Sequence, residues 1–90
     1  MALDVSELAL PVKPGVYLFK DSENRVLYVG KADNIRTRVR SGYKANNPDR
    51  EMIPKLLEQS ETVDYILVNN STEALILERN LILEYLPKWN

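Results

Sequence analysis

Two short apolar runs separated by a polar stretch constrain the fold of this chain more than any other feature. Residues 15–20 and 26–30 are predicted to be strands, because both runs are rich in β-branched and aromatic side chains. The segment between them, "DSEN" at 21–24, has the composition of a tight turn. The sequence therefore predicts a β-hairpin in which Lys20 pairs with Arg25.

This hairpin register places two tyrosines opposite each other. Tyr17 would face Tyr28 across the strands, and Gly15 would face Gly30. The other face of the hairpin holds only apolar side chains, and we expect it to be core: Val16, Leu18, Leu27 and Val29. Two interpretations of the tyrosines stay open. They serve packing alone, or they line a site at which the glycines leave room for a substrate.

The rest of the chain adds one strand and several helices. Helices are predicted over 4–10, 34–41, 50–59 and from Asn70 to about Tyr85, with a third strand over 62–68. Asp33 is expected to cap the helix that follows it, and Asn70 with Glu73 has the capping-box pattern. The expected fold class is a small α/β (α+β) layer, in which residues 1–90 form one domain.

Two charged residues fall on helix faces that are predicted to point inward. Arg38 shares a stripe with Ile35 and Val39. Glu78 lies within the inward stripe of the last helix, formed by Ala74, Leu77, Leu81 and Tyr85. A buried carboxylate is costly unless it is paired or bound to a cation. Glu78 is therefore expected either to form a salt bridge with Arg38 or to line a polar cavity beside the hairpin.

Composition excludes several kinds of chemistry. The chain has no Cys and no His, so a disulfide framework, a thiolate zinc site and a histidine base are all excluded. A single carboxylate without histidine suits a hard cation such as Mg²⁺. The N-terminal sequence "MALDVSELAL" lacks the basic region of a signal peptide, and no apolar run could span a membrane. We therefore expect a cytoplasmic protein with no membrane partner.

The charge distribution points to a local patch rather than a general nucleic-acid binder. The net charge is −1, which is low for a protein that binds DNA over a broad surface. Within residues 31–44, however, Asp33 is the only acid among several basic side chains: Lys31, Arg36, Arg38, Arg40 and Lys44. This segment is interpreted either as a solvated helix face or as a phosphate-binding patch.

Several motifs together resemble one known family. "GVY" at 15–17 and "YVG" at 28–30 are similar to the two halves of the GIY-YIG signature. "YVGKADNIRTRVRS" and the C-terminal "EALILERNLILEYLPKWN" resemble, within that family, the N-terminal endonuclease domain of UvrC-type bacterial excision-repair nucleases. The resemblance covers about residues 11–90. It implies a three-stranded antiparallel sheet flanked by helices, and hydrolysis of a DNA phosphodiester with one divalent metal, Mg²⁺ or Mn²⁺.

The resemblance also implies roles for individual residues. Glu78 would be the metal ligand, and Arg38 would hold the scissile phosphate. Tyr17 and Tyr28 would orient and deprotonate water with help from Lys31, and Asn90 would line the site. Tyr28 is favoured as the base because Lys31 follows it closely in the chain. The predicted DNA-binding set is Lys31, Arg36, Arg38, Arg40 and Tyr43.

The implied biological role is the 3′ incision of nucleotide excision repair. The substrate would be a damaged DNA duplex presented in a complex with UvrB, and residues 1–90 would be excised from a longer chain. Two departures from the family pattern bear on the site: Gly42 separates Ser41 from the aromatic Tyr43, and Asp33-Asn34 replaces a residue that is commonly basic. The alternatives are another GIY-YIG nuclease with a different DNA target and a catalytically silent module that binds DNA or a repair partner.

Overall fold

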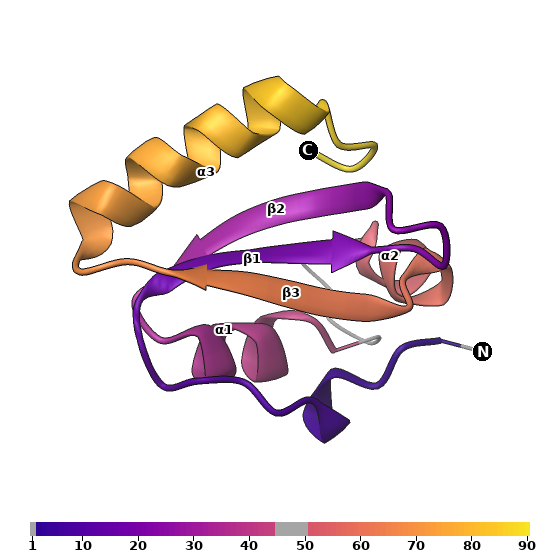
Figure 1. The fold of residues 1–90 in the computed structure, drawn as a ribbon. Helices are drawn as coiled ribbons and strands as arrows, with labels where there is room; N and C mark the ends of the chain where they lie inside the picture. Colours follow the sequence, from indigo (N-terminus) through magenta and orange to yellow (C-terminus); the bar gives the residue numbers. More distant parts are fainter. Residues whose placement is uncertain (1, 45–50) are drawn as a thin grey trace.

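A three-stranded antiparallel sheet lies at the centre of the protein, with helices on both sides of it (Figure 1). The computed structural model describes residues 2–44 and 51–90. In chain order its elements are the 3₁₀ helix η1 (Val5–Glu7), β1 (Gly15–Lys20), β2 (Val26–Ala32), α1 (Ile35–Gly42), α2 (Ile53–Gln59), β3 (Thr62–Leu67) and α3 (Ser71–Tyr85). The predicted fold class is confirmed. The predicted start of a helix at residue 50 lies outside the described residues.

Each face of the sheet has its own apolar cluster. The strand order is β2-β1-β3, so β1 is central. On one face Ala74 of α3 packs against β1 and β2, with Val16, Leu18 and Val29 fully or almost fully buried. The other face is covered by the N-terminal segment, α1 and α2, and its cluster includes Tyr17. Because both faces are covered, the predicted tyrosine face of the hairpin is also core.

The hairpin register differs from the predicted one by two residues. Tyr17 lies opposite Gly30, and Phe19 lies opposite Tyr28. One residue of the shift comes from a longer loop, because Lys20 pairs with Val26, and the other comes from a β-bulge next to this pair. The prediction that Tyr17 faces Tyr28 is therefore wrong. A shift of two residues preserves the alternation of side chains, so the two tyrosines still share a face.

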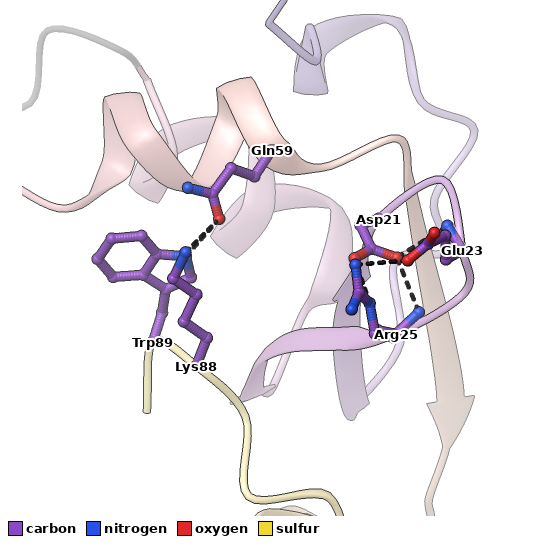
Figure 2. A network of polar contacts seen from close by, with 6 residues as sticks. All are labelled: Asp21, Glu23, Arg25, Gln59, Lys88 and Trp89. Atoms are coloured by element: carbon purple, nitrogen blue, oxygen red, sulfur yellow. Dashed lines mark hydrogen bonds and ion pairs between the residues drawn. The ribbon is translucent and has the colours of Figure 1, made fainter.

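The extra loop residue and the bulge both have visible causes. Asn24 adopts a left-handed conformation with φ of 65°, which asparagine tolerates better than most residues. The Asp21 carboxylate accepts hydrogen bonds from the backbone N–H groups of Glu23 and Arg25, each 2.9 Å long, and also contacts the Arg25 side chain (Figure 2). The bond from the Arg25 N–H is the main reason that the pKa of Asp21 is lowered. The bulge moves Leu27 into the cluster of the tyrosine face, contrary to prediction.

Side-chain caps define where the two longer helices begin. Asn34, not the predicted Asp33, caps α1, since its Oδ1 accepts from the Thr37 N–H at 3.1 Å. Asn70 caps α3 as predicted by accepting from the Glu73 N–H at 2.9 Å. The α3 helix ends at Tyr85, which is 49% exposed and does not belong to the inward stripe. Within residues 2–44 and 51–90, no helix is long and apolar enough to cross a membrane.

Candidate active site

An aromatic cluster fills the tyrosine face of the hairpin. It consists of Tyr17, Phe19, Tyr28 and Tyr43. The Tyr17 and Tyr43 hydroxyls are 2.7 Å apart and form a buried hydrogen bond. The Tyr43 ring centroid is 5.6 Å from that of Tyr17 and 6.0 Å from that of Tyr28, so both strand tyrosines contact it. Tyr28 is half-buried, whereas Tyr17 is 2% exposed.

Tyr43 enters this cluster because α1 continues through Gly42. The Tyr43 N–H donates to the Val39 carbonyl at 3.2 Å, so the last turn of the helix carries the ring inward. The glycine that separates Ser41 from the aromatic residue therefore does not exclude Tyr43 from the site. Tyr43 is nevertheless fully buried at 0% exposure. Its predicted role as a DNA-binding side chain does not fit this placement, because no part of the ring reaches the surface.

Position 30 must be a glycine because the Tyr17 side chain passes directly over it. The phenol of Tyr17 crosses β2 directly over Gly30, and a Cβ at this position would overlap the Tyr17 Cζ and Oη atoms. A Cβ on Gly15 would likewise overlap the carbonyl oxygen of Ile66. The space beside these glycines is thus occupied by the protein itself. The interpretation that they leave room for a substrate is wrong.

We expect Gly30→Ala to disturb the Tyr17 phenol and to destabilise the fold by about 1–3 kcal/mol, the usual range for overpacking. Gly42→Ala is the matched control, because the nearest atom to a Cβ there is the Arg38 Cδ at 3.8 Å. In that helical position alanine should stabilise by roughly 0.5–1 kcal/mol. Urea unfolding of both variants measures the difference. Equal stability of the two variants would contradict the close approach of Tyr17 to β2.

A polar hollow lies where the end of β2 meets the first turns of α1 and α3. Its volume is 450 Å³. The hollow is lined by Lys31, Ala32, Asp33, Asn34, Thr37, Arg38, Ser41, Ser71 and Ala74. The structure therefore brings together Lys31 and Arg38, two of the predicted site residues. The first turns of two helices also border the hollow, and the positive ends of their dipoles favour anions.

Arg38 occupies this hollow because it does not point into the core. Ile35 and Val39 are fully buried at 0% exposure, but Arg38 is exposed. The prediction that Arg38 shares their inward stripe is wrong, since an eight-residue helix buries only the narrow side that faces β1 and β2. Its guanidinium is left at the rim of the sheet, where it can meet a ligand from solvent.

Glu78 lies on α3 one helical turn beyond the part of the helix that borders this hollow. Ser71 and Ala74 line the hollow, whereas Glu78 borders a separate recess on α3 with Leu75 and Ile82. The side chain is half-buried. Among the described residues, the ion pairs join Lys20 to Asp64 and Arg25 to Asp21 and Glu23. The alternative of a Glu78–Arg38 salt bridge is therefore not observed.

The donor set around Glu78 fits a hard cation that keeps most of its water ligands. Within the described part of the chain, no group of three or more His, Cys, Asp or Glu side chains could enclose a metal ion. A lone, half-buried carboxylate such as Glu78 instead supplies one oxygen ligand. This arrangement suits Mg²⁺, which usually binds proteins through one or two carboxylates and retains several waters.

Two predicted DNA-binding arginines lie elsewhere. The Arg36 Nε donates to the Leu10 carbonyl at 2.7 Å, and the Arg40 Nη2 donates to the Leu8 carbonyl at 3.2 Å. Both side chains therefore attach the N-terminal segment to α1, and neither lines the polar hollow. Both side chains are exposed, so their role in DNA binding stays a prediction.

Asn90 holds the backbone of β2 rather than lining the hollow. Its Oδ1 accepts from the Val29 N–H at 2.7 Å, and its Nδ2 donates to the Val29 carbonyl at 2.9 Å. The preceding residue, Trp89, donates its backbone N–H to the Leu27 carbonyl at 2.9 Å. These bonds lie on either side of Tyr28. Sequence reasoning identified Asn90 but missed Gln59, which contacts Trp89 and carries no motif that could have revealed it.

Comparison with known proteins identifies the family of this chain. The profile of the UvrC-like GIY-YIG domain matches residues 13–90. UvrABC system protein C of Chlamydia abortus is 46% identical over 87 residues, which is 97% of this chain and 14% of that protein. The same protein of Chlamydia muridarum is 53% identical over 77 residues, 86% of this chain and 13% of its own length. This chain thus spans only a small part of the relatives it matches.

A solved structure covers the whole chain. The crystal structure of the GIY-YIG N-terminal endonuclease domain of UvrC from Thermotoga maritima, bound to its catalytic magnesium, superposes with a TM-score of 0.83 at 38% identity. The match covers 100% of this chain and 99% of that one. A variant of the same domain with a single tyrosine replaced by phenylalanine matches with a TM-score of 0.82. This chain therefore belongs to the family of UvrC-like GIY-YIG endonuclease domains.

Proposed function

We propose that this chain is a divalent-metal-dependent DNA endonuclease that hydrolyses a phosphodiester bond, and that it makes the 3′ incision of nucleotide excision repair. The observation that carries the proposal is the polar hollow, which Lys31 and Arg38 line together with Ser71 and Ala74 of α3, one helical turn before Glu78. The aromatic cluster packs against the same strand, β2, that supplies Lys31.

In this proposal, Arg38 and Lys31 bind the scissile phosphate. Both cations border the hollow, and the first turns of α1 and α3 add partial positive charge. A phosphodiester gains negative charge on its oxygens as water attacks. Fixed cations and N–H groups stabilise that charge without having to reorganise during the reaction. The two side chains would therefore contribute to the rate as well as to binding.

Tyr28 is the proposed general base. It is half-buried, so water can approach it, whereas Tyr17 is buried and hydrogen-bonded to Tyr43. Tyr17 and Tyr43 would then hold the cluster through their hydroxyl hydrogen bond and orient Tyr28, whose ring contacts Tyr43. Lys31, which follows Tyr28 by three residues on β2, would favour the negative charge that proton removal from water creates.

Glu78 is the proposed ligand of the metal ion, Mg²⁺ or Mn²⁺. When bound, such an ion supplies positive charge to the phosphate oxygens and lowers the energy of the developing anion. The half-burial of the carboxylate and the absence of an ion-pair partner within the described residues support this role. Asn90 would act indirectly, by holding β2 beside Tyr28.

DNA affinity would come largely from outside this chain. The net charge is −1, and the contacts of Arg36 and Arg40 leave Lys31 and Arg38 as the cations that line the hollow. Each neutralised phosphate contributes only modestly to binding at physiological salt. We therefore propose that a UvrB–DNA complex presents the damaged duplex to this domain. In a bacterial cell the reaction would take place in the cytoplasm, where the chromosome lies.

The proposal is tested with a duplex that carries one lesion and is labelled on the damaged strand. The chain is assayed alone and with UvrB already loaded on the duplex. We expect a single nick on the 3′ side of the lesion when Mg²⁺ or Mn²⁺ is added, and no nick in the presence of a chelator. Cleavage that persists in the chelator would contradict the metal role. Cleavage at an unrelated site would favour a different target.

A further inference from the structure

The outer edge of β2 needs a partner at the residues around Tyr28. Within residues 2–44 and 51–90, the strand order β2-β1-β3 leaves β2 with no strand on its outer side. Backbone groups of alternate residues face outward on such an edge, here those of Leu27 and Val29. An unpaired edge is prone to local opening, because its hydrogen bonds are exchanged with water. The position of Tyr28 therefore depends on how the edge is covered.

The segment after α3 covers this edge. As described above, Trp89 pairs with the Leu27 carbonyl, and the Asn90 amide pairs with both backbone groups of Val29. Figure 1 shows the chain turning back from the end of α3 toward β2. Since α3 also carries Glu78, this segment connects the helix of the proposed metal ligand to the strand of the proposed base.

A single oxygen on α2 anchors the segment. The Oε1 of Gln59, the last residue of α2, accepts from the Trp89 indole Nε1–H at 3.4 Å and from the Lys88 Nζ at 3.2 Å. Figure 2 shows the Gln59 amide pointing at the indole ring, with Lys88 beside it. The Lys88 ammonium lies 5.3 Å from the centre of that ring. The indole also packs against the buried cluster that contains the tyrosines.

We propose that Gln59 and Trp89 form a latch that positions Tyr28 for catalysis. The proposal rests on the nuclease function proposed above. Neither residue lines the polar hollow, so both are positioning residues. Opening the latch would free Asn90 and leave the outer backbone of β2 unpaired next to Tyr28. The rate would then fall, whereas phosphate binding by Lys31 and Arg38 would be retained.

The test compares Gln59→Leu, which removes the acceptor at similar volume, with Gln59→Glu, which keeps an oxygen acceptor. We expect Gln59→Leu to lower kcat by about 10- to 100-fold with little change in KM, because a misplacement of about 1 Å has an effect of that order. Gln59→Glu should restore most of kcat. Glu58→Leu, at the exposed neighbouring position of α2, is the matched control and should keep the wild-type rate.

Two measurements test whether the latch is closed, independently of the nuclease activity. Trp89 is the only tryptophan of the chain, so its fluorescence should shift to longer wavelength in Gln59→Leu as the indole becomes exposed. Hydrogen exchange of the Val29 amide, which donates to Asn90, should accelerate at least about 10-fold, while amides of the central strand β1 stay protected. Unchanged exchange and fluorescence would overturn the latch. If Gln59→Leu changes the fluorescence and the exchange rate but keeps the wild-type kcat, the latch does not position Tyr28. If the wild-type chain shows no metal-dependent nicking, the proposed nuclease function is refuted instead.

Discussion

Glu78→Gln is expected to abolish metal-dependent nicking while the domain stays folded. The substitution removes the negative charge that would hold the cation but almost preserves the side-chain volume. Glu78 is half-buried on α3, and no ion pair among the described residues depends on it. The folded state should therefore change little. Nicking of the lesion duplex and thermal melting are to be measured on the same preparation.

Glu84→Gln provides the control for this experiment. Glu84 is an exposed carboxylate near the end of the same helix, six residues beyond the half-buried Glu78. Full activity of Glu78→Gln would contradict the metal role. A large loss of melting temperature would instead indicate that the carboxylate stabilises the fold, because a buried charge that loses its partner is strongly destabilising.

Tyr28→Phe is expected to reduce the rate by at least about 10²-fold, the lower end for general acid–base catalysis. Tyr17→Phe should have a similar effect on the rate but should also lower stability by about 1 kcal/mol, because it removes the buried hydroxyl bond to Tyr43. Single-turnover nicking with UvrB-loaded duplex, together with urea unfolding, separates the two effects.

Tyr65→Phe is the matched control for the tyrosine variants. Tyr65 belongs to β3 of the same sheet but is 43% exposed. It should retain the wild-type rate and stability. If Tyr17→Phe and Tyr28→Phe both cleave at the wild-type rate, the tyrosines serve packing alone, which is the other interpretation that the sequence left open.

The start of α3 shows what could be predicted from short segments of sequence. Asn70 and Glu73 are close in the chain, and the hydrogen bond between them forms within one helical turn. The strands were found for a similar reason, since alternation of side chains is a property of consecutive residues. The start of α1 lies one residue later than predicted. Asp33 and Asn34 are both good capping residues, and the sequence alone does not distinguish them, whereas the structure shows that Asn34 accepts the capping hydrogen bond.

The hairpin register could not be predicted from neighbouring residues alone. The composition of the turn fits several loop lengths, and the choice was made by Asn24 and the bulge beside Lys20. The bulge moves Leu27 across the sheet, to the face where the cluster of α1 and α2 can bury it. Burial on the two faces therefore fixed a register that the turn residues alone did not specify.

The candidate site likewise has features that the sequence predicts and features that only the tertiary structure decides. The sequence alone determined the elements and the fold class, because local hydrogen bonding and side-chain periodicity depend on neighbouring residues. Through family resemblance it also suggested candidates for the residues of the site. Only the tertiary structure decided that Arg38 lines the hollow while Arg36 and Arg40 bind backbone carbonyls of the N-terminal segment. It also decided that Tyr43 is buried against Tyr17, and that Asn90 pairs with β2. These contacts join residues far apart in the chain, and their geometry is set by how whole elements pack.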